Sequence, residues 1–312
     1  MPFSFEERKA ALANPIRSLA ETWVLGLEGG EPVAAGYLEL RMLDNPTYAT
    51  VDVLVAPEVR RRGHGTRMLQ HIEDRATRAG RSVFNVDLEY PYDAGDDWGD
   101  KAFARAHGYR QVHEEIQRIL PMPVAPEYLA QLAAQAEHAH GDYRIETYLD
   151  GEEPEAVGRA VAALDATLIV EAPTGDRDDL EAEAVDEEAD REAEVRRRAQ
   201  RRTRVRSVAL TADGEAVAYS DLAVPEFDPG KAFQWGTLVR RDHRGHKLGL
   251  ATKVASLSTV QRLFPDVRRA VTWNAASNSH MIAINEALGY RASEKLATWE
   301  KRFENSVAIT RG

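Results

Sequence analysis

The pattern of apolar and polar positions divides the chain into two passages that each mix short strands with helices. In the first passage, Gly29 and Gly30 predict a turn between two strands of alternating polarity. Met68, Leu69 and Ile72 then lie on one face of a predicted helix. We expect strands at residues 22–27, 33–41, 50–55 and 82–88, and helices at residues 67–79 and 101–107.

A proline-rich connector follows the first passage. Residues 121–126 are Pro-Met-Pro-Val-Ala-Pro, and the fixed φ angles of proline suit a connector. An alanine-rich helix is predicted at residues 126–140, after which the same order of elements returns. The second passage predicts strands at residues 143–148, 204–211, 215–224, 232–239, 269–274 and 290–303. It predicts helices at residues 154–164 and 278–288, and a further helix that follows residue 249 and runs to Leu263. The repeat unit is therefore a whole domain, and we expect an N-terminal domain at residues 1–120, a linker at 121–141 and a C-terminal domain at 142–312.

The segment at residues 176–202 is a run of charge, acidic first and rich in arginine afterwards. Acidic residues early and basic residues late favour a helix because they complement its dipole. We interpret the segment as a solvated surface helix in preference to a nucleic-acid contact.

Composition narrows the function classes. The 312 residues are 43% hydrophobic and 29% charged, and the formal net charge of -11 opposes binding to nucleic acid or to an anionic membrane. Cysteine is absent, which excludes disulfides, thiolate metal sites and cysteine nucleophiles. No secretory signal is recognised, and no stretch reaches the ~18 apolar residues of a spanning helix. We expect a cytoplasmic protein with no metal and without nucleic-acid or membrane partners.

A basic, glycine-containing loop lies between a predicted strand and a predicted helix at residues 55–65. In this first loop, Arg60, Gly63 and Gly65 fit the pattern R-x-x-G-x-G. Glycine lets the backbone approach a diphosphate closely, and the start of the following helix offers unpaired N–H groups. The arginines add positive charge that complements phosphate.

A second loop, at residues 239–249, repeats this layout with the same spacing. When Val239 is aligned with Val55, the last residues of the preceding strands coincide. Arg244 and Gly249 then take the places of the first arginine and the final glycine of the first loop, and Lys247 takes the place of the middle glycine. Two loops in register are far more specific than either loop alone.

The two loops resemble motif A of the GNAT acetyltransferase superfamily, in which loop amides hold the pyrophosphate of coenzyme A. The resemblance covers nearly the whole chain, and the layout is similar to that of actinobacterial tandem acetyltransferases such as mycothiol synthase. It implies two tandem GNAT-like modules of α/β (α+β) fold, each a mixed, mostly antiparallel sheet flanked by helices, the first shortened at its N-terminus. It also implies acetyl-CoA as cosubstrate. The positions that the resemblance marks as coenzyme A contacts are Val53, Val55, Arg60, Arg61, Arg62, Gly63, His64, Gly65, Leu238, Val239, Arg244, Gly245, His246, Lys247, Leu248, Gly249 and Asn278.

A late helix adds to the resemblance. The family pattern has an asparagine, a tyrosine seven residues later and a final glycine-phenylalanine pair, and Asn278 with Gly289-Tyr290 is similar to it. Asn285 stands where the family often has a tyrosine that serves as general acid. The first module keeps Gly108-Tyr109 but has Asp97 and Ala104 in the asparagine and tyrosine places, so it departs further.

The resemblance implies direct attack of a neutral amine on the thioester carbonyl, which is polarised by a free N–H of a splayed strand. We expect that strand at residues 234–239, with Gly236 at a bulge. The candidates for proton handling are Asn285, His280 and Glu171, with Asp176 beside the last. In the first module the comparable residues are Asp52 and Glu89.

We expect the second module to be the catalytic one. In the first module only about twenty residues precede the first predicted strand, which leaves little chain to form the walls of an acceptor site. For the first module three roles stay open: it binds coenzyme A, serves as a scaffold, or completes the pocket of the second module. We expect a small-molecule primary amine as acceptor and a monomer or homodimer. An aminoglycoside-type antibiotic or a protein amine stays open as acceptor, and the alternative function is a non-catalytic CoA-binding or assembly module.

Overall fold

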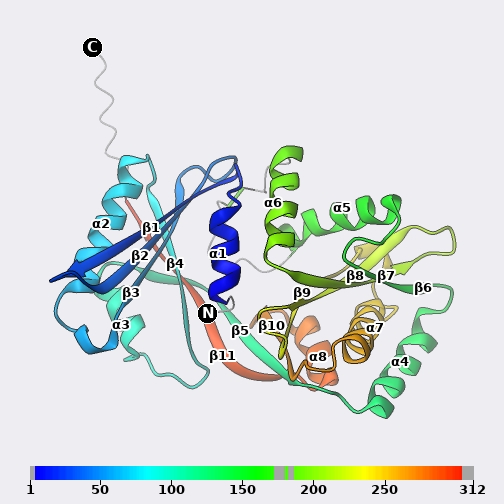
Figure 1. Ribbon diagram of the computed structural model, residues 1–312. Helices are drawn as coiled ribbons and strands as arrows, with labels where there is room; N and C mark the ends of the chain where they lie inside the picture. The colour runs from blue at the N-terminus through cyan, green and yellow to red at the C-terminus, as the bar shows by residue number, and fades with distance from the viewer. Residues whose placement is uncertain (1–3, 172–179, 182–185, 304–312) are drawn as a thin grey trace. The chain divides into compact units, whose positions relative to one another are not determined.

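The computed structural model describes residues 4–171, 180–181 and 186–303, and they form two compact units (Figure 1). We call the unit with most of the first passage the N-unit and the other the C-unit. Of the described residues, the N-unit comprises Ala11–Glu114, 180–181, 186–196 and 296–303. The C-unit comprises residues 4–10, 115–171 and Arg197–Lys295.

The N-unit contains a mixed sheet whose strands lie in the order β1-β2-β3-β4-β11. The first three strands pair antiparallel, and β3 pairs with β4 in parallel. Gly29 and Gly30 have positive φ angles of 62° and 91°, as the predicted turn between β1 and β2 requires. The elements are β1 (Leu19–Glu28), β2 (Glu31–Arg41), β3 (Tyr48–Val55), α2 (His64–Arg78), β4 (Val83–Pro91), α3 (Gly99–Ala106) and the final part of β11 (Arg291–Arg302).

The core of the N-unit lies between this sheet and α2. Ile72 and Phe84 are fully buried there, together with Trp299 from β11, which is 2% exposed. Burial of side chains of this size stabilises the fold by roughly 1.5–3 kcal/mol each. The sheet of the N-unit is therefore completed by residues from the far end of the chain.

The strands of the C-unit lie in the order β5-β10-β9-β8-β7-β6. β10 pairs with β5 antiparallel and with β9 in parallel, and the other pairs are antiparallel. The strands are β5 (Arg110–Pro121), β6 (Arg144–Leu149), β7 (Arg202–Leu210), β8 (Ala216–Pro225), β9 (Lys231–Val239) and β10 (Arg269–Ala275). The helices are α4 (Pro126–His140), α5 (Glu155–Glu171), α7 (Leu248–Leu263) and α8 (Ser279–Leu288).

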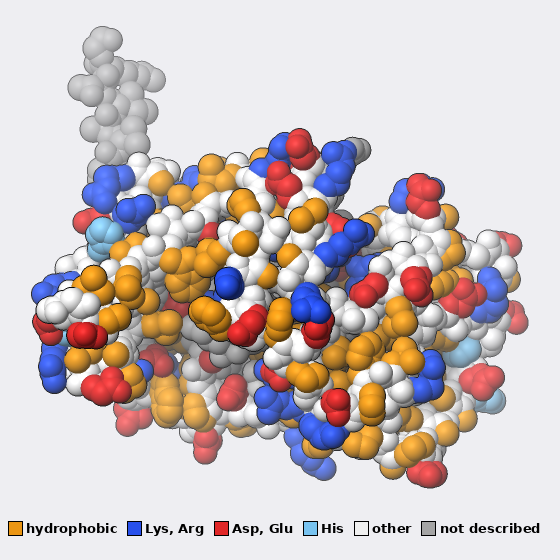
Figure 2. All heavy atoms as spheres, viewed as in Figure 1, with side chains coloured by type: hydrophobic (Ala, Val, Ile, Leu, Met, Phe, Trp, Pro, Cys, Tyr) orange, Lys and Arg blue, Asp and Glu red, His pale blue; other side chains and the backbone are white. Residues whose placement is uncertain are grey.

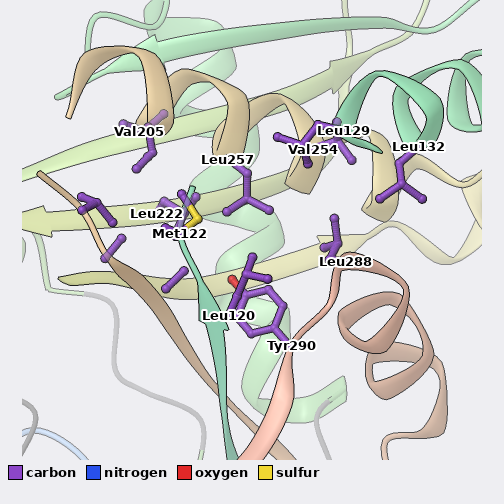
Figure 3. Close-up of a cluster of buried hydrophobic side chains, with 14 of the residues drawn as sticks. Leu120, Met122, Leu129, Leu132, Val205, Leu222, Val254, Leu257, Leu288 and Tyr290 are labelled. Carbon is purple, nitrogen blue, oxygen red and sulfur yellow. The ribbon is translucent and has the colours of Figure 1, made fainter. Parts of the chain in front are cut away.

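Helices cover both faces of the C-unit sheet. On one face, α7 packs on β7 and β8 and α4 packs on α7, which buries Leu222 and Leu257 beside Tyr290 (Figure 3). On the other face, α5 packs on β8 and β9, and its Val161 is fully buried against Tyr219. The predicted fold class, a mixed α/β arrangement with sheets flanked by helices, is confirmed.

The charged segment forms α6 (Glu187–Ala199) within its described part. Figure 2 shows acidic and basic side chains gathered over this helix. One position corrects the expectation of a solvated helix, because the Arg196 side chain is only 12% exposed and donates to the carbonyl oxygens of Ala11 and Asn14. Its guanidinium also pairs with Glu21. Asp176, expected near the substrate, lies outside the described residues.

Two elements were not predicted, α1 (Phe5–Ala13) and β5. The alternation of β5 is hidden because the charged Arg118 is buried in the same row as the apolar residues Ile116 and Leu120. The helix predicted at residues 154–164 is longer and extends to Glu171. The two units are not continuous along the chain, since β5 begins in the N-unit and ends in the C-unit while β11 does the reverse. The domain boundaries inferred from the sequence stay a prediction.

Candidate functional site

Two parallel strands separate in the C-unit at the end where the second loop begins. β9 and β10 pair from Lys231 to Phe233. Among the described residues the register stops there, so residues 234–239 continue without β10 beside them. Backbone N–H groups on that side of β9 are available to another partner. The expectation of a splayed strand at residues 234–239 is confirmed.

β9 carries a bulge within this separated stretch. Opposite it on β8, Ser220 pairs with Thr237 and Leu222 pairs with Gln234. Asp221 alone therefore faces two residues of β9, Trp235 and Gly236. This arrangement, with two residues opposite one, defines a β-bulge and redirects the backbone groups next to it.

Gly236 is required at the bulge by a close neighbour. A Cβ atom at this position would lie 2.5 Å from the Tyr219 hydroxyl and 3.1 Å from its ring. Any other residue would displace the tyrosine. The predicted bulge at Gly236 is therefore confirmed, and its cause is the tyrosine on the neighbouring strand.

The second loop turns from β9 into α7 through two left-handed residues. After a short 3₁₀ turn at Arg241–His243, Gly245 and Lys247 have φ angles of 90° and 52°. α7 begins at Leu248, so its first N–H groups have no partner within the helix and point out of its end. Arg244 is exposed, and its Nε donates to the Val239 carbonyl oxygen over 3.2 Å.

A charge cluster holds the base of this loop. Arg240 donates to Glu215 and to Asp242. These hydrogen bonds hold the pKa of both carboxyl groups below their ordinary values. Tyr143 adds a hydrogen bond of 2.6 Å to Nδ1 of His243. These contacts favour one conformation of the loop, and such pre-organisation lowers the entropic cost of binding a ligand.

The first loop in the N-unit has the same conformation. Arg60 Nε donates to the Val55 carbonyl oxygen over 3.1 Å, as Arg244 does to Val239. Arg61 and Gly63 have φ angles of 63° and 85°, and α2 begins at the next residue. The alignment made from sequence therefore matches residue by residue, and each loop holds one glycine and one basic residue in the left-handed region.

The two strands that lead into these loops differ. β3 and β4 pair from Tyr48 to Thr50 and then separate, as β9 and β10 do after Phe233. From that point β3 has five residues to Val55, while β9 has six to Val239. Because the register of β2 with β3 has no shift, the extra residue is the bulge of the C-unit.

The last glycine of each loop allows a second helix to approach. A Cβ at Gly65 would lie 3.3 Å from the Phe103 ring of α3, and one at Gly249 would lie 3.4 Å from Ile284 of α8. A Cβ at Gly63 would meet no atom within 4 Å, so the side of the loop next to it is open. These final glycines therefore serve helix packing as well as any ligand.

Asn285 lies in a buried polar chain that sequence analysis missed. It is fully buried, accepts a hydrogen bond of 3.0 Å from Lys253 Nζ and donates one of 2.6 Å to Asn274 Oδ1. Lys253 is 1% exposed, and burial lowers its pKa to about 7. Its signal in the sequence is a lysine on the apolar face of α7, between Leu250 and Leu257.

The structure does not bring the remaining candidates together with Asn285. His280 is exposed in the first turn of α8. Asn278 caps that helix, because its side chain accepts a hydrogen bond of 3.2 Å from the Met281 N–H. Glu171 ends α5, and its side chain lies outside the described part of the chain. In the first loop, His64 is buried and its Nδ1 lies 2.9 Å from an Arg67 nitrogen.

A second buried cluster that was missed lies beside the bulge. Arg206 donates to both oxygens of Asp221 over 2.8 and 2.6 Å and to Glu153 over 2.9 Å. Such paired, charge-assisted hydrogen bonds offset the cost of burying the ions. They fix the strand pair against which the bulge forms.

Neither a membrane helix nor a metal cluster is found within residues 4–171, 180–181 and 186–303. No helix in these ranges has the length and apolar character to cross a bilayer. No group of three or more His, Asp or Glu side chains there is placed to hold a metal ion.

Comparison with known proteins gives a family match for the N-terminal part of the chain and a fold match for nearly all of it. Residues 2–91 match the model of the Acetyltransferase (GNAT) family. No curated protein sequence matches the chain. Among solved structures, a "Tandem GNAT protein from the clavulanic acid biosynthesis pathway" is 26% identical with a TM-score of 0.77, and the match covers 96% of this chain and 88% of that one.

Two further structures show the same fold. A "GCN5-related N-Acetyltransferase from Sphaerobacter thermophilus" is 18% identical with a TM-score of 0.59, covering 90% of this chain and 80% of that one. A "GCN5-related N-acetyltransferase from Kribbella flavida" is 15% identical with a TM-score of 0.51, covering 96% and 97%. The family indicates acyl transfer from acetyl-CoA in general. Residues 2–91 thus carry a GNAT acetyltransferase domain, and the whole chain is similar in fold to a tandem GNAT protein.

Proposed function

We propose that the protein transfers an acetyl group from acetyl-CoA to a primary amine of a small molecule, by direct attack, in the C-unit. The observation that carries this proposal is the bulge of β9, which lies in the separated stretch that leads into the second loop. The N-unit has the loop and the separation of strands, but the strand that enters its loop, β3, has no bulge against β2.

The second loop fits the cosubstrate. The first N–H groups of α7 and the exposed Arg244 and Lys247 offer hydrogen bonds and positive charge to a diphosphate. Beside Gly245 there is open space, since an added Cβ would meet no atom within 4 Å. We propose that residues 244–249 bind the pyrophosphate and that the backbone of Leu238 and Val239 binds the pantetheine arm.

The bulge supports the chemical step. Redirected N–H groups near Gly236 and Thr237 are fixed in place and are suited to polarise the thioester carbonyl as negative charge develops on its oxygen. No covalent enzyme intermediate is needed, since both reactants are held together on the enzyme. The acceptor class is supported by the tandem GNAT protein compared above, which comes from the clavulanic acid biosynthesis pathway. We also propose cytoplasmic action as a monomer or homodimer, without nucleic-acid or membrane partners.

Two observations favour alternatives to this proposal, one a different function and the other a different unit as the active one. Asn285 and Ala104 stand where the family often has a tyrosine, which favours a non-catalytic CoA-binding or assembly module. The family model matches residues 2–91, which hold the first loop, and this favours the N-unit as the working half.

One experiment separates these possibilities. Acetyl-CoA is titrated into the purified protein by calorimetry, and free coenzyme A release is followed with a panel of primary amines. We expect binding, amine-dependent release, and crystallographic density for the pyrophosphate at residues 244–249. Binding without release on any amine would support the module without activity, and density confined to residues 60–65 would move the site to the N-unit.

A further inference from the structure

We infer that Asp165, held by Tyr219 beside the bulge, is the group that binds the ammonium of the acceptor and takes its proton. This inference rests on the proposed function. It names a residue outside the late helix where the family resemblance pointed, and it gives the acceptor a charge class, a primary amine that binds as a cation.

The position of Tyr219 carries the first step. Its side chain is fully buried between β8 and α5, in a cluster with Leu238 and Val161. Its hydroxyl lies against Gly236, where even a Cβ atom would come within 2.5 Å. The hydroxyl therefore sits over the backbone that we propose to hold the thioester carbonyl.

The partner of this hydroxyl carries the second step. The Tyr219 hydroxyl donates a short hydrogen bond to Asp165 Oδ1. Burial, together with the hydrogen bond and the negative charge of Asp165, raises the pKa of Tyr219 above its ordinary value. The tyrosine thus stays protonated near neutral pH and acts as a fixed donor that orients the carboxylate.

The charge around Asp165 carries the third step. Within the described ranges no basic side chain forms an ion pair with Asp165, and its residue is exposed on α5. The buried Arg206, whose guanidinium carbon lies 5.8 Å from the centre of the Tyr219 ring, is already bonded to Asp221 and Glu153. Tyr148 packs on the same apolar cluster and donates to Glu146. Asp165 is left as the accessible carboxylate beside the bulge, and a cationic group would neutralise it.

The N-unit provides an internal comparison. In the C-unit, Tyr219 of β8 lies opposite Leu238, which is one residue before β9 ends at its loop. In the N-unit, Ala35 of β2 lies opposite Leu54, which is one residue before β3 ends at its loop. Ala35 has no hydroxyl, and the strand opposite it has no bulge. Bulge and tyrosine therefore occur together in the C-unit, and both are absent from the equivalent described positions of β3 and β2.

The proton balance of the step is complete. The acceptor R–NH₃⁺ gives one proton to the Asp165 carboxylate and becomes R–NH₂. The amine nitrogen forms a bond to the thioester carbonyl carbon, the C–S bond breaks, and the sulfur leaves as a thiolate. The second nitrogen proton leaves and a proton is taken up by the thiolate. The products are R–NH–CO–CH₃ and free coenzyme A, and Asp165 returns its proton to solvent.

The test compares Asp165→Asn with Asp213→Asn, the same change at an exposed carboxylate in the turn between β7 and β8. Both variants, and the wild type, are assayed with the amine that the wild type acetylates fastest among ethanolamine, putrescine, tyramine and glucosamine. We expect kcat/KM for the amine to fall about 100-fold in Asp165→Asn and to rise again with pH as solvent deprotonates the amine. The Kd for acetyl-CoA should not change, and Asp213→Asn should match the wild type.

A second variant tests the role of the tyrosine. Tyr219→Phe keeps the ring but removes the hydrogen bond, so we expect a smaller loss of about 10-fold in kcat/KM with the Kd for acetyl-CoA unchanged. If the wild type turns over and the kcat/KM of Asp165→Asn stays within twofold of it at every pH, the inference is overturned and the proposed function stays intact. If the wild type binds no acetyl-CoA, or releases no free coenzyme A with any amine, both the proposed function and this inference are overturned.

Discussion

The two phosphate-type loops of this protein have the same backbone, but the strands that enter them do not. In both loops two residues, separated by one other residue, have left-handed φ angles. In both, an arginine also donates a hydrogen bond to the carbonyl oxygen of the last residue of the preceding strand. Only β9 adds a bulged residue before its loop. Loop conformation and the bulge that we propose for chemistry are therefore independent features, and a match to the loop alone does not locate activity.

The largest expected difference between the units concerns their final loop glycines. Gly249→Trp should reduce turnover by roughly 100-fold or more, because a Cβ there already lies 3.4 Å from Ile284 and the larger ring must displace the loop that we propose binds the pyrophosphate. Gly65→Trp makes the matched change in the N-unit and should keep turnover within about threefold. Steady-state rates at saturating amine measure both, and circular dichroism checks folding. Equal losses in the two variants would contradict a division of labour between the units.

A smaller difference concerns the buried lysine of α7. Lys253 takes the helix position that Leu69 takes in α2, counted from the aligned loops. Its pKa of about 7 in the folded protein lies below the ordinary 10.5, so the unfolded chain binds more protons between these values and stability rises with pH across that window. At and below pH 7 the penalty for charging the buried amine is present.

Lys253→Leu should therefore stabilise the protein most at low pH. We expect its advantage over the wild type in free energy of unfolding to shrink by about 2 kcal/mol between pH 7 and pH 9. Urea unfolding at the two pH values measures the change. Leu69→Met is the control, and its effect should not depend on pH. A pH-independent gain in Lys253→Leu would show that the lysine keeps its ordinary pKa.

The smallest effect tests the shared loop backbone. Gly63→Ala and Gly245→Ala add a methyl group that meets no atom but must adopt a left-handed φ, so each should destabilise by about 1 kcal/mol. Lys247→Ala changes one left-handed non-glycine residue into another and should be nearly neutral. Thermal unfolding measures all three. Different losses at Gly63 and Gly245 would show that the loops are not equivalent.

Much of each unit could be predicted from local sequence. The alignment of the two loops placed Arg244 on Arg60, and the glycine in β9 indicated the bulge at Gly236. These features depend on residues close together along the chain and on backbone freedom that only glycine has. Strand order could not be predicted in the same way, because the pattern of β11 indicates a strand but not the sheet that it joins.

The polar residues of the candidate site were harder to find. Asp165 is one acid among many on exposed helices, and only the register of β8 and the packing of α5 bring it to Tyr219. Lys253 and Asn285 meet across 32 positions of the chain. Sequence spacing within one helix gives no signal for such pairs, since the contact is made by tertiary packing.

The crossing paths of β5 and β11 bear on how this architecture is inherited. Each unit holds one strand segment encoded in the other half, and Trp299, near the end of the described chain, fills the core of the unit that begins at Ala11. A gene truncated between the halves would encode two fragments, each short of a strand and with an open sheet edge prone to aggregation. Each unit therefore depends on an unbroken chain, because it takes a strand segment from beyond its own main stretch.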